Sequence, residues 1–196
     1  MTHFDTLRKN LENNGFAVST FATAEQAANY LSEKLAGKGI AHGGSMTLEQ
    51  MGLLDRLEQT STLYRHRPGA DPAASMGAPV FICSVNGLAE TGEIINIDGA
   101  CNRVSSTMFG REEVYLVVGK NKIAPDYDAA LWRARNIAAP KNAQRLGRKT
   151  PCALKGDKCY NCNSPERICR ALTVLWKKPM TIKHAEVVLV DQDLGL

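Results

Sequence analysis

The stretch Val80-Phe81-Ile82-Cys83-Ser84-Val85 is almost entirely apolar, and a second apolar run covers 114–118. A strand with one face in water alternates apolar and polar residues, so these runs instead predict strands that are buried on both faces. Such strands are typical of parallel sheets covered by helices. The expected fold is therefore α/β, with a mainly parallel sheet as the middle of three layers.

Helical and extended patterns alternate on both sides of these two runs. Two capping boxes, Thr23 with Gln26 and Thr47 with Gln50, predict the starts of helices. The expected helices cover 4–11, 23–35, 47–57 and 125–140, the last ended by Pro140, and further strands are expected over 16–21, 40–42, 61–64, 93–98, 172–176 and 187–190. The composition of 66–72 predicts a loop.

Length and composition limit the class of protein. A chain of 196 residues with 44% hydrophobic and 22% charged residues is typical of one globular domain, expected here over 1–196. No apolar run approaches the ~18 residues of a membrane span. The first residues lack the pattern of a signal peptide, so we expect a cytoplasmic protein. Structural disulfides are uncommon there, and clustered cysteines indicate a metal site.

Charge is unevenly distributed along the chain. The segment 120–178 holds 14 Lys and Arg against 4 Asp and Glu, while the remainder holds 10 basic and 16 acidic residues. Such a segment attracts a small anion such as a carboxylate or phosphate, or else forms a solvated basic surface. Aromatic residues do not alternate with the basic ones, which argues against nucleic acid as the partner.

A glycine turn follows the predicted strand at 40–42. Gly43 and Gly44 allow close approach of a ligand to the backbone, and Ser45 adds a hydroxyl donor ahead of a helix. The turn lacks the lysine of a P-loop and the spacing of a Rossmann fingerprint, so it does not indicate a nucleotide site. We expect it to contribute to an anion site.

Polar residues follow the central buried strand, where open α/β sheets bind their ligands. Arg103 could hold a carboxylate through two parallel hydrogen bonds, or pair with an acid such as Asp98 or Glu90. Glu90 is the candidate nucleophile or base if the protein is an enzyme. The residues expected to bind the ligand, together with the glycine turn, are Asn86, Asp98, Asn102, Arg103 and Lys122.

Four cysteines share one short segment, Cys152-x6-Cys159-x2-Cys162-x6-Cys169. Structural zinc usually takes two Cys-x2-Cys pairs, whereas a single pair flanked by outer cysteines is closer to a one-loop 4Fe–4S ligand set. We therefore expect a 4Fe–4S cluster on this cysteine loop (152–169), with zinc as the alternative. Cys83 and Cys101 are expected to take no part.

Several separated motifs resemble, in order, the LUD-domain family (lactate-utilisation protein C-like). The motifs cover nearly the whole chain: Gly44-Ser45-x-Thr47, Asn96-Ile97-Asp98-Gly99, Asn102-Arg103-Val104, Val117-Val118-Gly119-Lys120-Asn121-Lys122-Ile123, Ala138-Ala139-Pro140-x-Asn142, Thr150-Pro151-Cys152, Ser164-Pro165-x-Arg167-Ile168-Cys169 and Asp193-Leu194-Gly195. The resemblance implies the NagB/RpiA/CoA-transferase-like fold. It also implies a component or accessory of L-lactate oxidation to pyruvate, alongside iron–sulfur or flavin oxidase subunits.

Other functions stay open at this point. One alternative is a stand-alone transferase or isomerase of the CoA-transferase-like superfamily that uses Glu90. Another is a metal-dependent regulatory or nucleic-acid-binding module that uses the basic segment. The sequence does not decide whether the chain is itself an enzyme, and a homodimer is compatible with it.

Overall fold

The two apolar runs that define the fold form neighbouring central strands, β4 and β7. The computed structural model describes residues 4–65 and 72–196, so the loop expected over 66–72 falls almost wholly outside the described residues. The large sheet has the order β1-β10-β7-β4-β2-β3, and every pair in it is parallel. Its strands are β1 (Ala17–Phe21), β2 (Gly39–His42), β3 (Thr62–Tyr64), β4 (Val80–Ser84), β7 (Glu113–Gly119) and β10 (His184–Val190). The mainly parallel α/β fold is thus confirmed.

A second, four-stranded sheet lies against one face of the first and has the order β8-β5-β6-β9. Its strands are β5 (Gly87–Ala89), β6 (Ile94–Asp98), β8 (Ile123–Ala124) and β9 (Ala171–Leu175). We expected the β6 and β9 segments as strands but not as a separate, partly antiparallel sheet. The chain reverses at Gly92, whose φ is +108°, and this turn makes β5 and β6 a hairpin.

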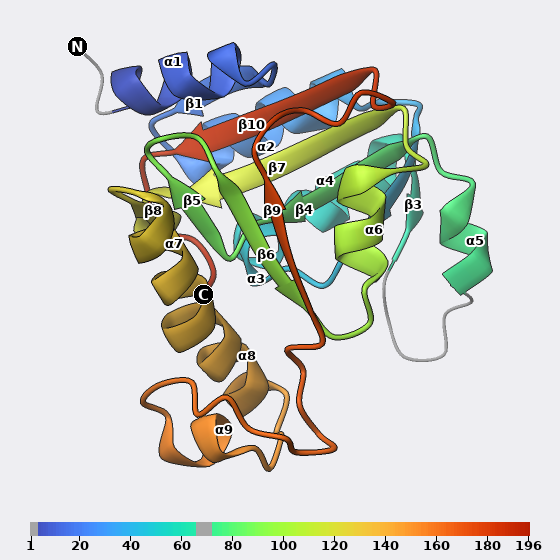
Figure 1. The fold of residues 1–196 in the computed structure, drawn as a ribbon. Helices are drawn as coiled ribbons and strands as arrows, with labels where there is room; N and C mark the ends of the chain where they lie inside the picture. Colours follow the sequence, from blue (N-terminus) through green and yellow to red (C-terminus); the bar gives the residue numbers. More distant parts are fainter. Residues whose placement is uncertain (1–3, 66–71) are drawn as a thin grey trace.

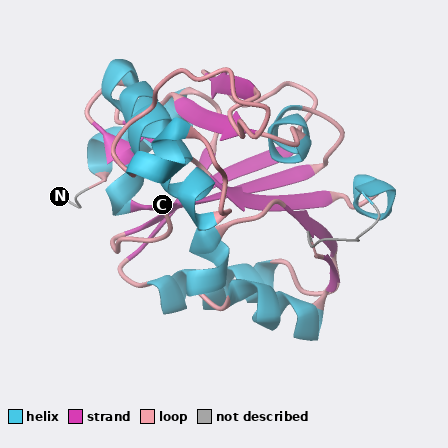
Figure 2. Cartoon of the chain, turned by 90° about the horizontal axis from the view of Figure 1, so that it is seen from below, coloured by secondary structure: helices cyan, strands magenta, loops and turns pink. Residues whose placement is uncertain are grey.

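Helices complete the layers on both faces (Figures 1 and 2). α2 (Ala24–Lys34), α3 (Met46–Gln50) and α4 (Leu53–Thr60) pack on one face of the large sheet around a core that includes Leu31, Leu57 and Tyr115. α1 (Asp5–Asn13) and the small sheet cover the other face. The remaining helices are α5 (Pro72–Met76), α6 (Asn102–Met108), α7 (Tyr127–Arg133), α8 (Ala139–Arg145) and α9 (Pro151–Lys155).

The helix expected from Pro125 to Pro140 differs at both ends. Asp126 caps α7 by accepting a hydrogen bond from the Ala129 amide at 2.8 Å. The helix does not end at Pro140, because a π-helical stretch, Ala134–Ala138, joins α7 to α8. Proline has no amide hydrogen to donate. Because the wider π-helical turn comes just before α8, Pro140 lies in the first turn of α8, where a helix does not need that donor. The helical run therefore reaches the cysteine loop.

No helix of the described residues is long and apolar enough to cross a membrane.

Candidate anion site and cysteine loop

A buried lysine lies at the carboxyl edge of the large sheet. Because β2, β4 and β7 are parallel, the residues at their ends meet there. Lys122, in the 3-10 turn Lys120–Lys122 after β7, places its Nζ 2.9 Å from Thr47 Oγ1 and 2.9 Å from Ser84 Oγ. We call Thr47, Ser84 and Lys122 the Lys122 site.

The environment of Lys122 is unusual for an ammonium group. Its side chain is buried, with 4% of its surface exposed, and none of the described acidic side chains forms an ion pair with it. Burial first, then repulsion from Arg133 and Arg103, lowers the pKa of Lys122 to about 7. The amine therefore gains or loses its proton near neutral pH, and a bound anion would favour the charged form.

Arg103 supplies charge to the Lys122 site, but most of its donors are already used. Its Nη2 donates to Asn86 Oδ1 at 2.9 Å and to the carbonyl of Ile97 at 2.6 Å, while its Nε lies 3.9 Å from Asp98 Oδ2. Arg133 is held similarly, donating from Nη1 to the carbonyl of Asn86 at 2.6 Å. Asn86 therefore accepts hydrogen bonds from two guanidinium groups and fixes both of them near Lys122.

Asp98 organises the start of α6 and does not point to a ligand of its own. Its Oδ2 accepts hydrogen bonds from the amides of Arg103 at 3.1 Å and Val104 at 3.2 Å. Asn102 is the first residue of this helix, directly after Cys101, which has a left-handed backbone with φ of +64°. These residues hold Arg103 in place.

The glycine turn borders the same region. A Cβ at Gly43 would lie 3.2 Å from the Cβ of Arg103, a tight contact, so glycine favours the close approach of the two segments. Gly44 is exposed. The predicted capping box at Thr47 is wrong, because Ser45 caps α3 by accepting a hydrogen bond from the Leu48 amide. Thr47 lies two residues later, inside α3, and its hydroxyl faces Lys122.

The last residues of the chain cover the Lys122 site. The carbonyl of Leu194 lies 3.3 Å from Thr47 Oγ1, and the Leu194 amide donates to Asn121 Oδ1 at 3.0 Å. A Cβ at Gly195 would lie 3.0 Å from Lys122 Nζ. This segment therefore lies close to the amine.

Glu90 is not brought to the Lys122 site. It follows β5, its amide donates to the carbonyl of Ala124 at 2.8 Å, and its carbonyl accepts from Asn10 of α1 at 2.7 Å. Among the described contacts, none joins Glu90 directly to Lys122, Arg103 or Ser84.

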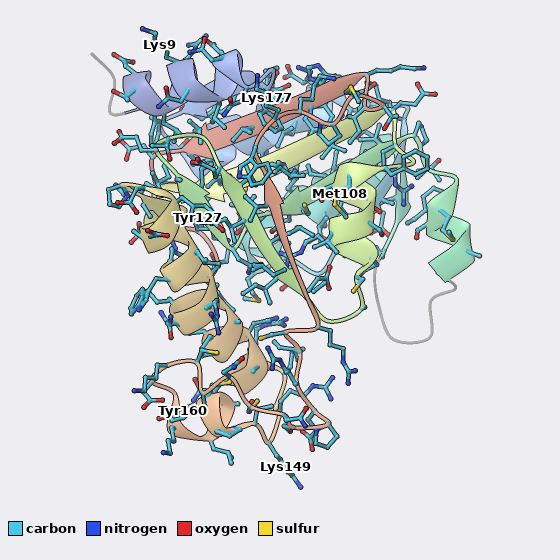
Figure 3. All side chains as sticks on the ribbon, viewed as in Figure 1. Lys9, Met108, Tyr127, Lys149, Tyr160 and Lys177 are labelled. Carbon is cyan, nitrogen blue, oxygen red and sulfur yellow. The ribbon has the colours of Figure 1, made fainter. Side chains whose placement is uncertain are left out.

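The cysteine loop forms a lobe at the far end of α8, where Figure 3 labels Lys149 and Tyr160. All four cysteines of the loop line one small cavity: Cys152, Cys159, Cys162 and Cys169. As the side chains stand, no three His, Cys, Asp or Glu residues in 4–65 and 72–196 are arranged to hold a metal ion. The shared cavity and the four-thiol donor set nevertheless suit an iron–sulfur cluster.

Hydrogen bonds hold the cysteine loop in shape. Arg167 donates from Nε to the carbonyl of Cys169 at 2.8 Å and from Nη1 to the carbonyl of Cys162 at 2.7 Å. The Asn161 amide donates to Cys159 Sγ at 3.4 Å. Burial, followed by repulsion from Cys159, raises the pKa of Cys169 to about 11, although the positive Arg167 acts in the opposite direction. The sulfurs are thus close enough to influence one another.

The other two cysteines lie elsewhere. Cys83 is fully buried in the core strand β4, and this burial raises its pKa to about 12. It packs as a small apolar residue, as the sequence predicted. Cys101 is not among the residues that line the cysteine cavity.

Sequence reasoning missed two residues near Lys122. Ser84 ends the apolar run 80–84, and a hydroxyl at the carboxyl end of a buried strand could have been taken as a site residue. Arg133 lies on α7 and is 8% exposed. An arginine on the apolar side of an amphipathic helix is the pattern that could have identified it.

Comparison with known proteins supports the resemblance given by the motifs. The family model for the LUD domain matches residues 4–190. A crystal structure of a DUF162 family protein from Deinococcus radiodurans is similar in fold, with a TM-score of 0.56, 14% sequence identity and 94% of each chain covered. No curated protein matches the chain.

Proposed function

The chain belongs to the LUD-domain family, and from this premise we propose that it is a component or accessory of L-lactate oxidation to pyruvate. In this role it binds a small carboxylate at the Lys122 site and holds a 4Fe–4S cluster on the cysteine loop. The observation that carries the proposal is a buried lysine with two hydroxyl neighbours and no acidic partner among the described residues.

The Lys122 site suits a carboxylate because its charges are all of one sign. Lys122 would donate to the carboxylate, with Thr47 and Ser84 as further donors, and Arg103 and Arg133 would add positive potential. Since the pKa of Lys122 is lowered to about 7, binding of an anion takes up a proton at and above neutral pH. Affinity should therefore fall as the pH rises from 6 to 9.

The cysteine loop would hold the cluster through Cys152, Cys159, Cys162 and Cys169. A bound 4Fe–4S cluster supplies one-electron transfer, which suits work beside iron–sulfur or flavin oxidase subunits. Arg167 fixes the loop through the carbonyls of Cys162 and Cys169, and the amide of Asn161 donates to Cys159 Sγ. The stand-alone transferase has less support, because no described contact joins Glu90 to Lys122 and the Glu90 carbonyl accepts from Asn10 of α1.

Anaerobic reconstitution with iron and sulfide tests the cluster. We expect brown protein with about four iron and four sulfide per chain. Cys159→Ser and Cys162→Ser should abolish this loading, whereas Cys83→Ser, which alters a core thiol, should keep it. Colourless protein with about one zinc per chain would show that the loop binds zinc and not an iron–sulfur cluster. Failure to take up either metal would remove this half of the proposal.

Calorimetric titration with lactate and pyruvate tests the anion site. We expect binding that weakens about tenfold or more in Lys122→Met and that takes up protons at pH 7.5. Lys141→Met removes an exposed lysine of the same length and serves as the control. Equal affinity in both variants, or no binding of either acid to the wild type, would contradict the proposed ligand.

A further inference from the structure

A cavity of about 230 Å³ opens beside the cysteine loop, on the side toward β6 and α7. It shares Cys159, Arg167 and Cys169 with the small cavity that the four cysteines line, but the other lining residues of the two cavities differ. None of the residues of the Lys122 site lines it. It therefore adjoins the proposed cluster site and is distinct from the Lys122 site.

Three arginines from two segments surround this cavity: Arg135 of the π-helical stretch, and Arg167 and Arg170 of the connection between α9 and β9. The lining contains no Asp or Glu, and none of the ion pairs of the described residues involves these three arginines. Arg167 and Arg170 each donate to carbonyls of the loop, which fixes them, while Arg135 is exposed. Guanidinium groups that converge without an acid favour a carboxylate or phosphate.

The rest of the wall is apolar. Ile97 of β6, Leu131 of α7 and Leu172 of β9 line the cavity, and Leu172 is 49% exposed. The volume lies just below the ~300 Å³ at which ligand pockets usually begin, so a dinucleotide is too large. The three arginines and the apolar wall together favour a molecule with one acidic group and one small apolar ring or chain.

We propose that this arginine cavity binds a small organic anion, with its carboxylate or phosphate on Arg135, Arg167 and Arg170 and its apolar part against Leu131 and Leu172. The site goes beyond the proposed function, because it needs neither lactate at the Lys122 site nor metal on the loop. Binding has a direct consequence for the loop. Arg167 also holds the carbonyls of Cys162 and Cys169, so a bound anion stabilises the arrangement of the cysteines.

Phenyl phosphate is the probe, because it combines an acidic group with one apolar ring. We expect it to bind metal-free wild-type protein, and to bind at least about tenfold more tightly than inorganic phosphate or benzyl alcohol, each of which lacks one half. Arg135→Gln combined with Arg170→Gln should weaken phenyl phosphate about tenfold or more. Arg148→Gln, an exposed arginine outside the cavity, should leave the affinity unchanged.

Two further measurements separate this site from the others. Phenyl phosphate should slow the reaction of Cys159 and Cys169 with a thiol reagent, and should do so less in the double arginine variant. Lys122→Met should not change its affinity. If Lys122→Met abolishes binding while the arginine variant retains it, or if inorganic phosphate binds as tightly as phenyl phosphate, the inference is wrong. Failure of metal loading or of lactate binding would leave it standing.

Discussion

Replacing Lys122 by methionine should make the protein more stable at neutral pH. The side chain is buried without an acid, and its pKa falls from the ordinary 10.5 to about 7. At ~1.36 kcal/mol per pKa unit, a shift of this size corresponds to about 5 kcal/mol against the charged form. Methionine has a similar length and no charge, and Thr47 and Ser84 still bond each other at 3.1 Å. Allowing for two lost hydrogen bonds of ~1 kcal/mol each, we expect a gain of about 2–4 kcal/mol at pH 6.

The gain should depend on pH in a defined direction. Between pH 7 and 10.5 the unfolded chain holds the Lys122 proton while the folded chain has released it, so wild-type stability rises with pH in this window. The advantage of Lys122→Met should therefore be largest at pH 6 and shrink toward pH 10.

Urea unfolding of both proteins at pH 6, 7.5 and 9 measures this difference, and Lys141→Met, at an exposed position, should lie within about 0.5 kcal/mol of the wild type. A variant that is less stable than the wild type at pH 6, or a difference that does not change with pH, would refute the reasoning. Gain of stability together with loss of pyruvate binding is the expected mark of a functional residue.

Three other substitutions test the surrounding structure. Gly99→Ala places a Cβ 2.9 Å from the Ile168 carbonyl, so it should push the cysteine loop away and lower iron content on reconstitution, whereas Gly77→Ala, with open space, should not. Glu186→Gln should cost about 2 kcal/mol at pH 7. Burial acts to raise the pKa of Glu186, but its hydrogen bonds leave it lowered, so the cost should shrink as the pH falls from the ordinary value of 4.5 through the lowered pKa; a cost in urea unfolding that does not shrink on acidification would contradict this. Asn96→Val should stabilise by about 1–2 kcal/mol, because neither polar atom of that buried amide has a partner among the described residues. Destabilisation in the same assay would instead indicate a bound water or ligand there.

The large sheet could be predicted because a strand that is buried on both faces has a continuous apolar sequence. The runs 80–85 and 114–118 became the adjacent strands β4 and β7, with nearly the expected bounds. The small sheet could not be predicted in this way, since the pairing of β6 with β9 joins segments about 75 residues apart and depends on the turn at Gly92. Local patterns also misjudged Pro140, because the π-helical stretch that accommodates it has no recognised sequence pattern.

The candidate sites also differ in how far the sequence alone could predict them. The cysteine loop was visible as a spacing, and its four thiols do line one cavity. The Lys122 site depends on three strand ends that meet only in the folded sheet, so the sequence could suggest Lys122 and Ser84 separately but not their contact. The arginine cavity combines Arg135 with Arg167 and Arg170 of a later segment, and no single stretch of sequence contains it.

The end of β6 connects these regions physically. The side chain of Asp98 holds the helix start that positions Arg103 beside the Lys122 site, while its carbonyl accepts from the Arg170 amide at 3.0 Å, at the edge of the arginine cavity. Gly99, the next residue, packs against the backbone of Ile168 in the cysteine loop. The turn at 98–99 therefore contacts both the segment that carries Arg103 and the segment that carries Ile168 and Arg170. If the two sites are coupled, the coupling is reciprocal, because each ligand must change the affinity for the other by the same factor.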